Sequence, residues 1–251
     1  ERFWEAADLI VRAWETHDGP FSWEGKYFHH RQVNIWPRPY QQSGLPVWIP
    51  TQSTSTAIEA AERGYTLATI LNGMKGCKRI FDAYRSRSEE IGTTVGPDKL
   101  AYLGLVYVGE TEREALDGGR RLQWYLQNNK VADQFMNVPG YLDVHARASM
   151  LRDAAHGRAP RSPLADVIDS SVEDLVDAGL FFVGTPEQVV EQVIRFHGAV
   201  GGFDHFLAMV QAGTMATDMV NRSMELFAEE VLPRLRREFT PSSDLASAAA
   251  A

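Results

Sequence analysis

The chain has 251 residues, 44% of them hydrophobic and 23% charged, which is typical of a globular protein with a substantial core. Its 33 acidic and 25 basic side chains give a formal charge of −8 and form no basic run, so we expect no nucleic-acid partner. No apolar run approaches the roughly 18 residues that span a membrane. The single cysteine, Cys77, excludes an internal disulfide and a multi-cysteine zinc site, so we expect a cytoplasmic protein without a membrane segment.

The first residues already follow a helical pattern. Phe3, Ala6, Ile10 and Trp14 fall on one stripe, and no capping residue stands before them. Because the chain starts inside this pattern, with Glu1 and without Met, we expect that the beginning of the protein is missing.

An extended arm follows this helix. Residues 21–35 alternate between apolar and polar side chains, which predicts a short hairpin, and residues 36–40 form a proline-rich link. His29 and His30 are neighbours in the arm. Adjacent residues of an extended segment point to opposite faces, so we interpret them as surface histidines and expect no metal site.

Residues 46–64 predict a strand, a polar turn and a helix. The apolar run 47–49 ends at Pro50, and helical spacing resumes before Gly64 closes the helix. The turn carries an amide and four hydroxyl side chains: Gln52, Ser53, Thr54, Ser55 and Thr56. Free backbone N–H groups at a helix start, with small hydroxyls beside them, suit a phosphate group. The same residues are favoured caps of ordinary helices, so the local pattern leaves both interpretations open.

Strands and helices continue to alternate after this helix. Residues 67–71 predict a buried strand, 75–91 a helix, and 100–108 a strand that is apolar on both faces, as in a parallel sheet covered by helices. Thr111 and Glu114 have the spacing of a capping box and open the next helix. This alternation predicts an α/β fold with right-handed crossovers.

Residues 118–175 depart from the rhythm, and we interpret them as an insertion. They include Trp124 and Tyr125 and a stretch rich in arginine, alanine and proline. Long irregular segments inside a compact domain often close over a site, so the insertion is a candidate lid. Its aromatic side chains are equally well explained by packing.

The alternation returns near the end of the chain. Residues 180–183 predict a strand, Thr185 caps the helix after it, and residues 205–210 predict the last strand. Thr217 is expected to cap a final helix, and residues 240–251 to form a disordered tail.

Several short motifs occur in a fixed order along the chain: Gly25-Lys26-Tyr27, Trp36-Pro37-Arg38-Pro39, Pro46-Val47-Trp48-Ile49, Gln52-Ser53-Thr54-Ser55-Thr56 and Gly184-Thr185-Pro186-Glu187-Gln188. Each is weak alone, but their order and spacing resemble the bacterial luciferase-like monooxygenases from residue 1 to about residue 237. The resemblance implies a (β/α)8 TIM barrel. This chain would be its C-terminal half, about strands 5–8, forming one partial domain over residues 1–239 with an insertion after the third strand of the chain.

The resemblance also implies a flavin enzyme. In this family the turn after the fifth barrel strand holds the flavin phosphate, and the matching positions are Gln52, Ser53, Thr54, Ser55 and Thr56. Reduced FMN from a separate flavin reductase would react with O2 and oxygenate a small organic substrate, in a full-length protein that forms a homodimer.

The same resemblance leaves the catalytic residues unknown, because they are expected in the absent N-terminal half. Two alternatives stay open. One is an oxidoreductase of the same fold that uses coenzyme F420, and the other is a non-catalytic subunit that binds flavin.

Overall fold

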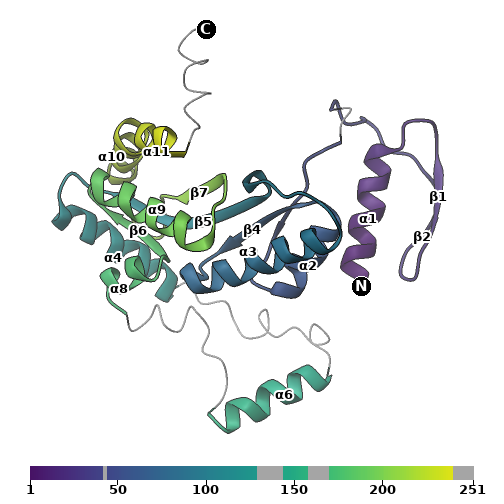
Figure 1. Cartoon of the computed structure of the whole chain (residues 1–251), viewed down its shortest axis with the longest axis horizontal. Helices are drawn as coiled ribbons and strands as arrows, with labels where there is room; N and C mark the ends of the chain where they lie inside the picture. The colour runs from purple at the N-terminus through teal and green to yellow at the C-terminus, as the bar shows by residue number, and fades with distance from the viewer. Residues whose placement is uncertain (42–43, 129–143, 158–169, 240–251) are drawn as a thin grey trace. The chain divides into compact units, whose positions relative to one another are not determined.

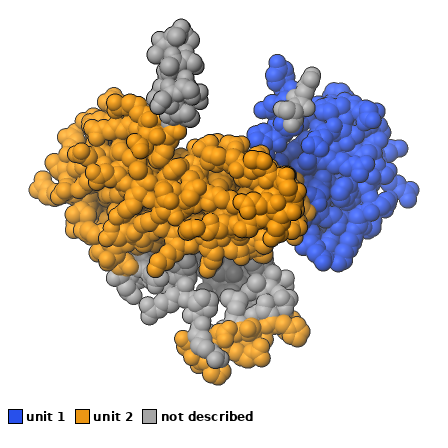
Figure 2. Space-filling model, in the orientation of Figure 1, with its two compact units in different colours: residues 1–48 blue, residues 49–251 orange. Residues whose placement is uncertain are grey.

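The computed structural model describes residues 1–41, 44–128, 144–157 and 170–239. The chain divides into two compact units, Glu1–Trp48 and Ile49–Ala251 (Figures 1 and 2). The expected tail and two parts of the expected insertion, residues 129–143 and 158–169, lie outside the described residues. None of the helices within the described ranges is long and apolar enough to cross a membrane.

The first unit is a helix and a hairpin, and a carboxylate of the helix binds the hairpin turn. It contains α1 (Arg2–Glu15), β1 (Phe21–Glu24) and β2 (His29–Val33). The two strands pair antiparallel, which confirms the predicted helix and hairpin. The Glu5 carboxylate accepts hydrogen bonds of 2.9 to 3.1 Å from the backbone N–H groups of Lys26, Tyr27 and Phe28. The helix therefore holds the hairpin turn through three consecutive amides.

From residue 48 onward, strands and helices alternate as the α/β pattern predicts. The elements are β3 (Trp48–Pro50), α2 (Thr54–Glu62), β4 (Thr66–Ile70), α3 (Gly73–Glu90), a 3-10 turn (Pro97–Lys99), β5 (Leu100–Val108), α4 (Glu112–Asn128), α6 (Val144–Ala155), α8 (Val172–Asp177), β6 (Phe181–Gly184), α9 (Pro186–Val200), β7 (His205–Met209), α10 (Thr217–Leu226), a π-helical turn (Phe227–Val231) and α11 (Leu232–Phe239).

β5 is the central strand of the sheet (Figure 1). It pairs in parallel with β4, β6 and β7, and β3 lies beside β4. Leu105 is in register with both Phe181 of β6 and Met209 of β7, so these two strands lie on opposite edges of β5. Leu103 is likewise in register with Ile70 of β4 and Leu207 of β7. The carboxyl ends of β4, β5 and β7 therefore lie at the same end of the sheet.

Helices bury the central strand on both faces. α2 and α3 pack against β4, α4 and α10 against β5, and α4, α8 and α9 against β6. Every residue of β5 except Leu103 is buried, which confirms the reading of this apolar run as a strand inside a parallel sheet.

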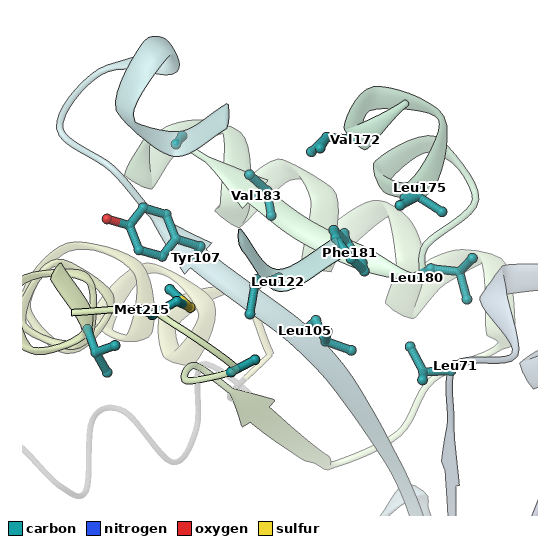
Figure 3. Packing of buried hydrophobic residues seen from close by; sticks show 13 residues of the cluster. Leu71, Leu105, Tyr107, Leu122, Val172, Leu175, Leu180, Phe181, Val183 and Met215 are labelled. Carbon is teal, nitrogen blue, oxygen red and sulfur yellow. The ribbon is translucent and has the colours of Figure 1, made fainter. Parts of the chain in front are cut away.

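Two apolar clusters form the core of the sheet. One gathers Leu105 and Tyr107 of β5 with Leu122 of α4, Leu175 of α8 and Met215, which precedes α10 (Figure 3). The other is aromatic and is built from side chains of β5, β6, β7, α9 and the loop before β7: Tyr102, Phe182, Phe206, Phe196 and Phe203. The two clusters hold β5, β6 and β7 together with the helices that pack on them.

Two predicted helix ends are confirmed by their chemistry. Gly64 follows α2 with φ of +66°, a conformation that suits a residue without Cβ. Thr185 and Gln188 form a reciprocal capping box at the start of α9, as their spacing predicts.

Three local features differ from the sequence predictions. Thr217 is the first residue of α10, and Ala216 occupies the cap position without a side-chain hydrogen bond, so the predicted cap was wrong. α4 continues through Gly118 to Asn128, so the region expected to be an insertion begins inside a regular helix. The last helix passes through a π-helical turn just before Pro233, whose missing N–H disturbs regular helical bonding.

Candidate functional site

The polar bend of Gln52, Ser53, Thr54, Ser55 and Thr56 lies directly after β3, where the chain enters α2. Gln52, Ser53 and Ser55 are exposed, and Thr54 and Thr56 are half-buried. The Gln52 Nε2 donates a hydrogen bond of 3.0 Å to the carbonyl oxygen of Ile70, the last residue of β4. The bend is therefore attached to the carboxyl end of the neighbouring strand, and its two serines are exposed.

The start of α2 keeps its amide hydrogens available. Ser53 holds the cap position in an extended conformation, but its side chain makes no hydrogen bond to the helix. Its Oγ instead lies 2.7 Å from the Oγ of Ser55, and its own N–H donates to Thr51 Oγ1. The first helical bond runs from Ala57 N–H to the Ser53 carbonyl, so the amides of residues 54–56 precede the helical ladder and have no acceptor in it. Ser53 thus occupies the cap position, but its side chain does not cap the helix.

The charge at this helix start favours an anion. α2 has no acidic residue in its first turn, and the polar bend holds no ionisable side chain. Glu59, one turn further on, is paired with Arg63 at 2.7 Å. The positive end of the helix dipole is thus not offset by a nearby carboxylate.

The end of β4 brings a second group of polar and strained residues to the same edge. Thr69 is buried, and its Oγ1 accepts a hydrogen bond from Asn72 Nδ2. Between them Leu71 has φ of +52°, in the left-handed region that non-glycine residues rarely occupy. The sequence predicted only a buried strand at residues 67–71. An apolar run does not indicate the backbone conformation of the residue at which the strand ends.

Gln211 and Gly213 both follow β7 in the chain. Gly213 has φ of +57°, and an added Cβ would lie 3.2 Å from both Trp124 and Tyr125. The turn after β7 therefore packs closely on the end of α4, which favours packing as the role of these two aromatic residues. Of the candidate lid, residues 118–175, only 129–143 and 158–169 lie outside the described ranges, and nothing in the described part tests the lid interpretation.

Other candidate groups from the sequence do not assemble into a site. His29 and His30 are both exposed, and the described ranges contain no cluster of three metal-ligating side chains. Cys77 is fully buried, and burial raises the pKa of its thiol, so it is unreactive at neutral pH. Four cavities of about 320 to 570 Å³ lie elsewhere in the second unit, and none of these four is lined by the polar bend.

The family model described as "Luciferase-like monooxygenase" matches residues 1–202. The chain belongs to the luciferase-like monooxygenase family. The match includes the polar bend, the capping box of α9 and every strand but β7.

Known members of the luciferase-like family extend beyond this chain. Limonene 1,2-monooxygenase of Rhodococcus erythropolis is 29% identical over 243 residues, which are 94% of this chain and 55% of the relative. The chain thus spans little more than half the length of this curated relative.

Two solved structures share the fold. The oxygenating constituent of 3,6-diketocamphane monooxygenase from Pseudomonas putida, in complex with FMN, is 22% identical with a TM-score of 0.58, covering 92% of this chain and 62% of that one. The coenzyme F420-dependent tetrahydromethanopterin reductase of Methanopyrus kandleri is 18% identical with a TM-score of 0.62, covering 93% and 62%. The luciferase-like fold therefore accommodates both cofactors.

Proposed function

We propose that the chain is the C-terminal part of an FMN-dependent monooxygenase and that its polar bend holds the flavin phosphate. The observation that carries this proposal is the start of α2. It is exposed, rich in hydroxyl side chains and free of acidic residues, and the side chain of Ser53 at the cap position makes no hydrogen bond to the helix. Family membership and the FMN-bound relative support the choice of flavin among phosphate-bearing ligands.

The exposed part of the sheet supports a place for this chain in a larger barrel. Ile70, Leu103 and Leu207 form one row across β4, β5 and β7. All three are partly accessible, and Leu207 is 38% exposed although it is apolar. A barrel wall has such a row on its inner side, where strands of the other half cover it. We propose that β3, β4, β5 and β7 correspond to strands 5–8 of a (β/α)8 barrel in the full-length protein.

Each residue of the bend has a distinct part in this proposal. The amides of Thr54, Ser55 and Thr56 donate to the phosphate oxygens, and the Ser53 and Thr56 hydroxyls add two further donors. Gln52 fixes the bend against β4. Bound reduced flavin supplies the electrons that activate O2 for oxygenation of a small organic substrate, and the protein binds it, orients it and excludes water.

Removing two hydroxyls tests the anchor. In the full-length enzyme, Ser53→Ala with Thr56→Ala should weaken FMN binding by roughly 1–3 kcal/mol, the scale of hydrogen bonds to charged groups. The measurement is a titration of flavin fluorescence. A matched control is Ser86→Ala with Thr94→Ala, two exposed positions outside the bend, which should leave the affinity unchanged. Equal FMN affinity of the double variant and the wild type would contradict the proposal that the polar bend holds the flavin phosphate.

The cofactor and the partners are tested with the full-length protein. We expect FMN to bind more tightly than coenzyme F420, and O2-dependent turnover only when a separate flavin reductase is present. The F420-dependent relative gives the second candidate, which tighter binding of F420 and hydride transfer without O2 would favour. Flavin binding without any turnover would favour the non-catalytic subunit. We also propose a homodimer, which light scattering of the full-length protein tests.

A further inference from the structure

A cavity of about 450 Å³ lies among α9, the start of β7, the π-helical turn and α11. α9 contacts both the turn and α11, and Figure 1 shows the two helices side by side. Phe203 and Asp204 in the lining precede β7, and Phe206 is its second residue, so the cavity lies at the amino end of this strand. The polar bend is attached to the carboxyl end of β4, at the opposite end of the sheet. The cavity is therefore separate from the proposed flavin site.

The wall of this cavity is apolar and rich in aromatic rings. Val193, Phe203 and Leu235 are buried, with exposed fractions of 2%, 5% and 7%. The His197 ring lies 5.1 Å from the ring of Phe203 and 4.2 Å from the ring of Phe239. Two further rings come from β7 and the π-helical turn: Phe206 and Phe227. Such a wall offers a ligand apolar contact and the faces and edges of several rings.

The π-helical turn helps to build this wall. Its widened hydrogen bond runs from the Leu232 N–H to the Phe227 carbonyl oxygen, and both of these residues line the cavity. Residues five apart on a regular α-helix would point about 140° away from each other, whereas one π-helical turn brings them to the same side. Single π-helical turns inside α-helices occur frequently at functional sites, so this turn is a second indication of a ligand.

The formal charges of the lining cancel. It holds one carboxylate and one guanidinium, those of Asp204 and Arg236, and both residues are exposed. Burial lowers the pKa of His197 below 6.5, so its imidazole is mainly uncharged at neutral pH. The lining therefore favours an uncharged ligand over an anion or a cation.

We propose that this cavity binds a small uncharged aromatic molecule. A ring inside it buries apolar surface and gains edge-to-face or offset contacts with the rings of the wall, so it is preferred to an aliphatic molecule of the same size. An apolar cavity of roughly 150 Å³ is enough to hold benzene, and this one is larger. Water is a poor occupant of the apolar part, because it needs several polar partners.

Four probes separate aromatic character from charge in the full-length protein. Toluene is uncharged and aromatic, methylcyclohexane is uncharged and aliphatic, and benzylammonium and benzoate are charged and aromatic. By calorimetry we expect saturable binding of toluene, about fivefold tighter than that of methylcyclohexane, the factor that about 1 kcal/mol of ring contacts produces. Both ions should bind more weakly than toluene.

Two variants locate the site. Leu232→Trp places a larger side chain on the wall and should weaken toluene binding about tenfold or more, whereas Leu151→Trp, at an exposed position outside the lining, should not. Phe239→Leu removes a ring that is 40% exposed, so it leaves the core intact. It should lower the preference for toluene over methylcyclohexane about threefold, and the control Phe3→Leu should leave that preference unchanged.

Each outcome decides the proposal without reference to flavin. An absence of saturable toluene binding would overturn it. Toluene binding that is equally tight in Leu232→Trp and in the wild type would place toluene elsewhere in the protein and would also overturn it. The same holds for an unchanged preference in Phe239→Leu. None of these results bears on FMN binding, which is measured separately at the polar bend.

Discussion

Arg85 joins two helices that are far apart in the sequence. From α3 its guanidinium donates to the carbonyl oxygens of Val200, Gly201 and Gly202, at 2.7 to 2.9 Å, where α9 ends. A planar fork reaches three acceptors that a single ammonium cannot reach together. Arg85→Lys should therefore lower the free energy of unfolding by roughly 1.5–3 kcal/mol although it keeps the charge.

Urea unfolding of the full-length protein checks this expectation. Arg79→Lys, at an exposed position of the same helix, is the matched control and should stay within about 0.5 kcal/mol of the wild type. If the two variants were equally stable, the three carbonyl contacts would contribute no net stability.

His197 makes stability depend on pH. Burial lowers its pKa below the ordinary value of 6.5, and the Arg85 guanidinium lowers it further, while the backbone of Phe203 and the Asp204 carboxylate oppose the shift. The unfolded chain then binds a proton at higher pH than the folded one, so stability should fall as pH decreases through 6.5 and below. His197→Phe should flatten this part of the profile. Midpoints of urea unfolding between pH 7.5 and 5 test it, and parallel profiles for the variant and the wild type would contradict it.

At the scale of single elements, we expect the same substitution, glycine to alanine, to have opposite effects on stability in two helices. A Cβ on Gly118 of α4 would overlap the ring of the buried Tyr107, whereas a Cβ on Gly198 of α9 would meet nothing within 4 Å. Gly118→Ala should therefore destabilise by roughly 1–3 kcal/mol through overpacking. Gly198→Ala should stabilise by roughly 0.5–1 kcal/mol, because alanine loses less backbone entropy in a helix.

Thermal unfolding of the two glycine variants provides the comparison. Each serves as the control for the other, since the chemical change is identical. A shift of Tm in the same direction for both would show that close packing between α4 and β5 does not decide the stability of this helix.

Strands and helices with continuous apolar patterns were predictable from the sequence. β5 was expected at residues 100–108 and is found there, because a strand buried on both faces is apolar throughout. The π-helical turn before Pro233 and the short helix α8 were not predicted. Their patterns span only one or two turns, too few for a periodic signal, and the capping box of Ser171 and Asp174 that opens α8 was overlooked.

At the scale of the whole molecule, the site was only partly predictable. The polar bend was identified from its hydroxyl residues and their resemblance to a family, but local sequence could not show that Ser53 leaves α2 uncapped. That depends on which partner the Ser53 hydroxyl meets. The cavity of about 570 Å³ escaped notice because α4, α8, α9 and β6 contribute to it from distant parts of the chain. Such a juxtaposition exists only after folding.

The direct test of the central claim compares FMN with riboflavin, which differs from FMN by the phosphate alone. Kd values of both flavins are measured for the full-length wild type and for Thr54→Pro, which removes one amide donor at the first position of α2, where proline suits the helix geometry. We predict that the wild type binds FMN at least about tenfold more tightly than riboflavin, and that Thr54→Pro reduces this preference about tenfold while riboflavin affinity stays the same. An unchanged preference for FMN in Thr54→Pro would contradict the account.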